Sequence, residues 1–183
     1  MFCFPTVADS RLVLIDMQEK LLPAMHEHER VLARCQVLLK GMTALGVPVV
    51  VTEQYPKGLG KTVPELAEFL PENTPVFAKT SFSCFGAEGF TEALNHTARP
   101  ALILAGVEAH VCCQQTALEA LAKGFQVLIP FDAVSSRRSA EADHALAMLR
   151  TLGCGVFSVE ALLFMLLGDA KHPAFKTISQ LVR

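Results

Sequence analysis

Apolar and polar positions follow two patterns along this chain. Short runs of consecutive apolar residues, rich in Val, Ile and Leu, are separated by longer segments in which apolar residues recur every three or four positions. Continuous apolar runs are typical of strands that are covered on both faces of a sheet. Such runs predict strands at 11–15, 47–51, 75–78, 101–105, 126–130 and 154–159.

The segments between these runs predict helices. Apolar residues spaced by three and four, from Val31 to Leu45, indicate one buried face of a helix that ends near Gly46. Further helices are expected over about 112–123 and 139–152, and two short ones within 160–183. Alternating strands and helices favour right-handed crossovers, and therefore a parallel sheet between helices.

Length and composition favour a globular protein. The 183 residues suffice for one domain, 1–183, with a full hydrophobic core. The net charge is −2 and the Lys and Arg residues are scattered, whereas a nucleic-acid-binding protein normally shows a basic face. We therefore expect no nucleic-acid partner, and an RNA-processing role is disfavoured.

Membrane insertion and secretion are not expected. The run ALLFMLL at 161–167 is far shorter than the roughly 20 residues of a membrane-spanning helix. The stretch MFCFPTVADSR lacks a basic head followed by a long apolar run, so no secretory signal is expected. The six cysteines show no CxxC spacing, which favours free thiols and a cytoplasmic location.

Ligands of parallel sheets gather beyond the carboxyl ends of the strands, so the residues that follow each strand are the first candidates for chemistry. Asp16 follows the first predicted strand, where it is either a helix cap or a catalytic carboxylate. Lys79 follows the third, where it either extends to solvent at the sheet edge or pairs with Asp16.

Cys112 and Cys113 follow the fourth strand, and helical spacing predicts different environments for them. Cys113 is in phase with the apolar residues of the predicted helix, which indicates the core. Cys112 is in phase with the polar residues, which places it on the solvent side of the helix start. A helix N-terminus lowers a thiol pKa, so Cys112 is the candidate nucleophile. The alternative is that both thiols are inert.

These three side chains together predict a hydrolytic mechanism. Cys112 would attack an electrophilic carbon, while Asp16 would take the thiol proton and later act as acid and base. Lys79 would hold the carboxylate and stabilise the thiolate. Backbone N–H groups near Cys112 would bind the developing oxyanion.

Three stretches resemble the isochorismatase-like cysteine hydrolases: LVLIDMQEKLLPAM, AKTSFSCF and GVEAHVCCQQTALEALAKGFQVLIPFDAVSSR. The resemblance extends over about residues 11–160. It implies a three-layer αβα sandwich with a six-stranded parallel sheet, and it assigns the family's Asp, Lys and Cys to Asp16, Lys79 and Cys112. The segment TEQYPKGLGKTVPEL resembles the subgroup of isochorismatase domain-containing proteins.

The resemblance also implies a cis peptide between Val107 and Glu108, with the amides of Glu108 and Cys112 facing the oxyanion. It further implies a homo-oligomer. Metal-dependent relatives carry histidines after the second strand, where this chain has TEQYP, so neither a metal nor another cofactor is expected. The candidate pocket residues are Gln18, Tyr55, Phe82 and His110.

Some of these assignments have alternatives. His110 is either a second candidate base or a residue of the loop or a subunit contact, and the aromatic residues are equally typical of a core. The leading hypothesis is a metal-free hydrolase of a small carbonyl substrate, with an amide or related C–N bond, acting through a thioester. The alternatives are hydrolysis of the vinyl ether of isochorismate, and a scaffold protein that has lost activity.

Overall fold

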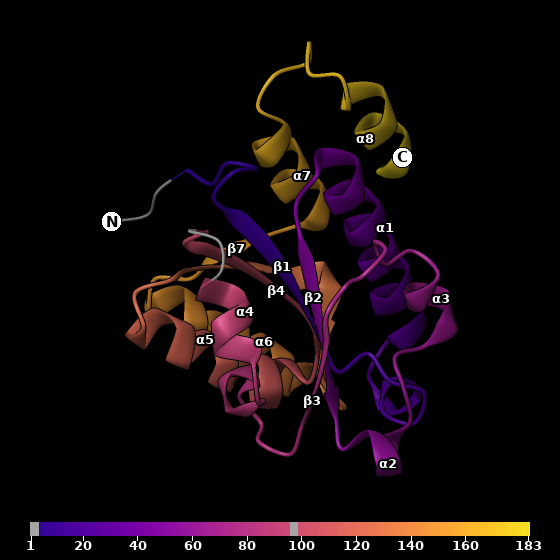
Figure 1. Cartoon of the computed structure of the whole chain (residues 1–183), viewed down its shortest axis with the longest axis vertical. Coiled ribbons are helices and arrows are strands. Elements are labelled where there is room, and N and C mark those ends of the chain that lie inside the picture. Colours follow the sequence, from indigo (N-terminus) through magenta and orange to yellow (C-terminus); the bar gives the residue numbers. More distant parts are fainter. Residues whose placement is uncertain (1–3, 96–98) are drawn as a thin grey trace.

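The computed structural model describes residues 4–95 and 99–183. At its centre lies a parallel sheet of strand order β3-β2-β1-β4-β5-β7, and a short strand, β6, pairs with the end of β4 (Figure 1). The strands are β1 Ser10–Ile15, β2 Val49–Gln54, β3 Val76–Lys79, β4 Ala101–Val107, β5 Gln126–Pro130, β6 Val134–Ser135 and β7 Gly155–Phe157.

All of the predicted strands are present and parallel, so the expected sheet is confirmed. Sequence periodicity did not predict β6, because two residues are too few to form a pattern. The strand predicted at 154–159 is shorter, since it covers only Gly155–Phe157.

Helices cover both faces of the sheet (Figure 1). On one face lie α1, α7 and α8, and on the other lie α4, α5 and α6. The bounds are α1 His28–Leu45, α2 Pro56–Leu59, α3 Pro64–Ala67, α4 Phe90–Asn95, α5 Gln114–Ala122, α6 Ser139–Thr151, α7 Val159–Leu167 and α8 Phe175–Leu181. The three-layer αβα architecture is therefore confirmed.

The central strands show why their sequences are continuously apolar. Leu12 and Leu14 of β1 belong to the core on the α1 side, whereas Val13 and Ile15 belong to the core on the α5 side. Because successive strand residues point to opposite faces, a strand with helices on both sides has no solvent face.

Most predicted helix ends agree with the structure. Gly46, in the left-handed conformation with φ 71°, ends α1 and donates its N–H to carbonyl groups of the last turn. The segment predicted as one helix over 112–123 differs. It begins with a single π-helical turn, η3 (Ala109–Cys113), and continues as α5.

Gly106 allows β4 to approach β1 closely. It pairs with Ile15 and adopts φ +120°, and a Cβ at this position would lie 2.0 Å from the carbonyl oxygen of Ile15. This contact brings the loop that carries Cys112 next to the end of β1. Within the described ranges, no helix is both long and apolar enough to cross a membrane.

Candidate active site

Asp16 lies directly after β1 and is held at both carboxylate oxygens. Oδ1 accepts a hydrogen bond of 2.7 Å from Thr52 Oγ1, and Oδ2 accepts one of 2.7 Å from Lys79 Nζ. Its backbone is left-handed, with φ 54°, a conformation that Asp tolerates better than most residues. Asp16 therefore caps no helix, and its carboxylate points into a buried polar cluster.

Lys79 ends the edge strand β3, yet its side chain has no exposed surface. Its ammonium donates to Asp16 Oδ2, to Gln54 Oε1 at 2.7 Å, and to the carbonyl oxygens of Ser81 and Phe82 at 3.3 and 3.2 Å. The alternative in which Lys79 extends to solvent at the sheet edge is wrong. Its counter-charge lies inside the protein.

Opposing effects act on the pKa of Lys79. Burial is the largest and would lower this pKa, because it disfavours the ammonium. The nearby Asp16 and Cys112 act in the opposite direction, and together the electrostatic partners raise the pKa of Lys79 above its ordinary value. The side chain therefore remains an ammonium, and the contact with Asp16 is an ion pair.

Cys112 lies in η3 and is only 5% exposed. The prediction that it faces solvent at the helix start is wrong. Thr116, one turn further on and in the same predicted polar phase, is also fully buried, and its hydroxyl accepts the backbone N–H of Cys84 at 3.0 Å. Segments from distant strands thus cover the helix face that periodicity assigned to solvent.

The thiol pKa of Cys112 shifts in the direction opposite to the prediction. Burial is the main cause, and the Asp16 carboxylate, both through its charge and as hydrogen-bond partner, adds to it. Together they raise the pKa of Cys112 to about 12, against the weaker lowering effect of Lys79. Near neutral pH the resting group is a thiol beside a carboxylate.

A further thiol of this cluster, that of Cys84, was not among the residues predicted from the sequence. It is buried, and its Sγ lies 3.7 Å from Thr52 Oγ1. The Thr52 hydroxyl proton is directed to Asp16, so the thiol of Cys84 is the donor in this contact. Burial, followed by the charge of Asp16, raises the pKa of Cys84 to about 11. The stretch AKTSFSCF contained Cys84, but only the fold shows it beside Asp16.

Cys113 belongs to the hydrophobic core on the α5 side of the sheet, as predicted. Its side chain is buried, and this burial raises the pKa of its thiol well above the ordinary range. The five cysteines within the described ranges are free, and Cys3 lies outside those ranges.

The peptide bond between Val107 and Glu108 is cis, as the resemblance implies. Val107 is buried at the end of β4. The side chain of Glu108 anchors the loop, since its Oε2 accepts the backbone N–H and the Nε–H of Arg137, both at 3.0 Å. The carboxylate of Glu108 is thus occupied, which leaves its backbone amide as its candidate contribution to chemistry.

The role of Gln18 as a pocket residue stays a prediction, and its observed contacts are structural. Its side chain is fully buried. Its amide accepts the backbone N–H of Gln54 at 2.7 Å and donates to the carbonyls of Gln54 and Gly60 at 3.0 and 2.7 Å. These bonds hold the segment after β2 against the end of β1. Alternation of apolar and polar positions gives no signal for such a role.

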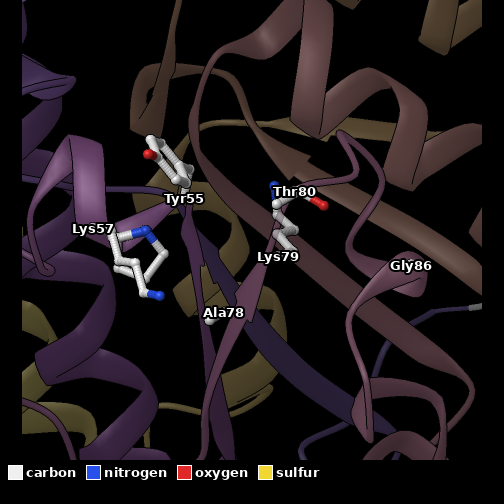
Figure 2. A pocket seen from close by; sticks show the side chains of 7 residues that line it. Tyr55, Lys57, Ala78, Lys79, Thr80 and Gly86 are labelled. Atoms are coloured by element: carbon white, nitrogen blue, oxygen red, sulfur yellow. The ribbon is translucent and has the colours of Figure 1, made fainter.

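Tyr55 lines a depression of about 410 Å³ with Lys57, Lys79, Thr80 and Gly86 among its neighbours. Figure 2 shows Tyr55 and Lys57 on one side of this depression and Gly86 on the other. Because the Lys79 side chain is buried, Lys79 contributes its main chain to the lining. Tyr55 is 55% exposed, so the alternative that it belongs to the core is wrong.

Phe82 and His110 have different surroundings. Phe82 is 52% exposed and thus not a core residue, and its carbonyl oxygen accepts from Lys79. The Nδ1 of His110 lies 2.8 Å from Ser136 Oγ, and the ring lines a separate, polar depression of about 360 Å³ with Arg137, Arg138 and Glu141. This placement favours the role of His110 as a loop residue over that of a second base.

Metal-ligating side chains are not grouped in the part of the chain that the structure describes. No three or more His, Cys, Asp or Glu residues there are arranged to hold an ion. The Asp16 carboxylate is instead held by a hydroxyl and an ammonium.

Residues 10–161 match the family model of the isochorismatase domain. The chain belongs to the isochorismatase family. It is 43% identical over 175 residues to isochorismatase domain-containing protein 2 of Danio rerio, covering 94% of this chain and 86% of that protein. It is 41% identical over 168 residues to isochorismatase domain-containing protein 1 of Salmo salar, covering 92% of this chain but only 59% of that longer protein.

Among solved structures, a MAR1 ribonuclease from Caenorhabditis elegans has the same fold. It superposes with a TM-score of 0.93 at 36% sequence identity, covering 98% of this chain and 92% of that one. The comparisons thus establish the family and the fold of this chain.

Proposed function

We propose that this protein is a metal-independent hydrolase of a small carbonyl compound with an amide or related C–N bond. Asp16, Lys79 and Cys112 would carry the reaction. The observation that supports this most strongly is the buried Asp16–Lys79 ion pair acting directly on the Cys112 thiol. A carboxylate fixed at both oxygens beside a protonated thiol is the arrangement that general-base activation of a nucleophile needs.

In the first half-reaction the Cys112 sulfur attacks the carbonyl carbon while its proton passes to Asp16. The raised thiol pKa disfavours a preformed thiolate, so proton transfer would accompany attack. The oxyanion would be bound by the backbone amides of Glu108 and Cys112. Protonated Asp16 then gives its proton to the leaving nitrogen, the C–N bond breaks, and a thioester remains on Cys112.

In the second half-reaction water attacks the thioester carbon and gives a proton to Asp16. The tetrahedral intermediate collapses, the C–S bond breaks, and Asp16 returns the proton to the sulfur. Lys79 remains charged throughout, because its role is to keep Asp16 oriented and to stabilise negative charge on sulfur. The products are a carboxylic acid and an amine or ammonia.

An electrophilic trap tests the nucleophile. Incubation with iodoacetamide, followed by peptide mapping by mass spectrometry, should label Cys112 in preference to its neighbour Cys113, which is 1% exposed. Labelling of Cys113 in its place would contradict the mechanism. A panel of small amides, ureides and carbamoyl compounds should then identify the substrate class, with Cys112→Ala as the inactive control.

RNA hydrolysis is a second candidate, because the C. elegans protein of the same fold is called a ribonuclease. The net charge of −2 speaks against extended contact with a phosphate backbone. Incubation of purified protein with single-stranded RNA distinguishes the two candidates. Cleavage that Cys112→Ala abolishes would favour the ribonuclease, and intact RNA would favour the amide hydrolase.

Two further alternatives have direct tests. Turnover of isochorismate that persists in Cys112→Ala would favour vinyl ether hydrolysis, since that reaction needs no thioester. Absence of turnover across the whole substrate panel, together with no preference for Cys112 in labelling, would favour a scaffold protein.

The homo-oligomer and the cytoplasmic location remain predictions. Light scattering during size-exclusion chromatography would test the homo-oligomer.

A further inference from the structure

The side-chain amide of Gln54 bridges the Lys79 side chain and the main chain that follows it. Gln54 is the last residue of β2 and pairs in register with Lys79. Its Oε1 accepts from Lys79 Nζ at 2.7 Å, and its Nε2 donates to the carbonyl of Thr80 at 2.8 Å. The contact between Gln54 Oε1 and the ammonium is as short as the ion pair with Asp16.

The buried side chain of Gln18 holds the backbone of Gln54 in place. The Gln18 amide binds both the backbone N–H and the backbone carbonyl of Gln54. The next backbone N–H along the chain, that of Tyr55, donates to the carbonyl of Lys79 at 2.8 Å. A continuous chain of amide hydrogen bonds thus runs from the end of β1, through the end of β2, to the end of β3.

We propose that Gln54 is a positioning residue that holds the Lys79 ammonium on Asp16 and within electrostatic reach of Cys112. The inference rests on the roles proposed above for Asp16, Lys79 and Cys112. Gln54 is uncharged, so its side chain orients the Lys79 ammonium without neutralising the positive charge. Its contribution is to the geometry of Lys79, and it touches no reacting atom.

The other hydrogen-bond acceptors of Lys79 show why the contact with Gln54 Oε1 determines the orientation of the Lys79 ammonium. The hydrogen bond from Thr52 to Oδ1 orients the Asp16 carboxylate, so the position of Oδ2, which accepts from Lys79, is fixed. The carbonyls of Ser81 and Phe82 lie farther away, at 3.3 and 3.2 Å, and belong to the segment after β3. Without Gln54 Oε1, the ammonium would relax toward these carbonyls while remaining paired with Asp16.

A displaced ammonium would change the reactivity of the Cys112 thiol. Burial and Asp16 raise the pKa of Cys112, Lys79 lowers it, and the neighbouring Cys84 thiol also acts on it. A weaker effect of Lys79 therefore leaves less thiolate at a given pH. Because each pKa unit changes the thiolate fraction tenfold, even a partial loss is measurable as a slower alkylation rate.

The experiment compares the rate of Cys112 alkylation by iodoacetamide, resolved by peptide mapping, across pH 7 to 10 in four proteins. These are the wild type, Gln54→Met, Lys79→Met and the control Gln36→Met. Gln36, half-buried on α1, also donates its side-chain amide to a backbone carbonyl, that of Glu65 at 3.0 Å. Thermal unfolding is measured for each protein, and Gln54→Ala serves if Gln54→Met does not fold.

We expect Gln54→Met to slow Cys112 alkylation by about three- to tenfold and to shift its pH profile upward, because each pKa unit is a factor of ten. Lys79→Met should be slower still, and Gln36→Met should match the wild type. A wild-type profile in Gln54→Met, even with a lower melting temperature, alongside slow alkylation in Lys79→Met, would overturn this inference alone. A wild-type profile in Lys79→Met would instead refute the proposed role of Lys79, and this inference with it.

Discussion

Lys79 Nζ lies 2.7 Å from Asp16 Oδ2, and neither side chain has exposed surface. The ion pair connects the end of the central strand β1 with the end of the edge strand β3, across β2. A buried charge without its partner is strongly unfavourable, since neither water nor a counter-charge stabilises it. Stability and reactivity of the site are therefore coupled through one contact.

Removing one partner of this pair should destabilise the protein more than removing both. We expect Lys79→Met or Asp16→Asn alone to lower the free energy of unfolding by about 3–5 kcal/mol, the usual cost of breaking a buried pair. The double variant should lower the free energy of unfolding less than either single variant does. Urea unfolding of all four proteins measures this, with Arg30→Met, at the exposed pair with Glu27, as a control that should change little.

Asp16→Asn should separate simple thiol reactivity from hydrolysis. After burial, Asp16 is the largest cause of the raised Cys112 pKa, so loss of its charge should speed alkylation of Cys112 at a fixed pH near 8. Hydrolysis should fall by at least about a hundredfold, because the group that moves the proton is absent. If Asp16→Asn slowed the alkylation of Cys112 as well as hydrolysis, Asp16 would have only a structural role.

Stability should fall in alkaline solution through the buried thiols, and Cys35 offers a test far from the site. Burial, and then the charge of Asp132, raises the pKa of Cys35 to about 12. Because the pKa of this thiol is higher in the folded than in the unfolded protein, the thiol stabilises the fold fully below the unfolded-state pKa near 8.5. As the pH rises from there toward 12, this contribution to the free energy of unfolding is lost at ~1.4 kcal/mol per pH unit. Cys35→Ala should therefore show a shallower decline above pH 9 than the wild type.

Gly106→Ala should destabilise the protein more than Gly124→Ala. Both glycines have positive φ, which costs an L residue about 1–2 kcal/mol. A Cβ at Gly124 meets open space, whereas one at Gly106 would lie 2.0 Å from the Ile15 carbonyl oxygen, adding about 1–3 kcal/mol of overpacking. Chemical unfolding compares the two. Equal losses would mean that the contact between β1 and β4 has room for a Cβ at position 106.

Hydrophobic patterning predicted much of this architecture. Runs such as LVLI at 12–15 have no polar alternation, because helices cover both faces of the sheet and leave no solvent side. The same reasoning placed Asp16, Lys79 and Cys112 at strand ends. The two-residue β6 was not predictable, since its pairing depends on the position of β4.

Periodicity failed where distant segments meet. It assigned Cys112 to solvent because it considered the helix alone, but Cys112 is buried and the segment after β3 contacts that face at Thr116. The single π-helical turn at Ala109–Cys113 also changes the phase of the side chains before α5 begins. The contacts of Gln18, Gln54 and Cys84 left no local signal, because each joins residues that are 36, 25 and 32 positions apart.

Local patterns along the chain suffice to predict the order of strands and helices, the parallel sheet and the edge at which polar residues gather. These follow from local patterns, because burial on one or both faces leaves a periodic trace along the chain. The tertiary structure determines which side chains touch, that Lys79 turns inward to Asp16, and that burial and Asp16 raise the pKa of the Cys112 thiol. Those properties depend on the distance and burial of charges brought together by folding, and no local pattern records them.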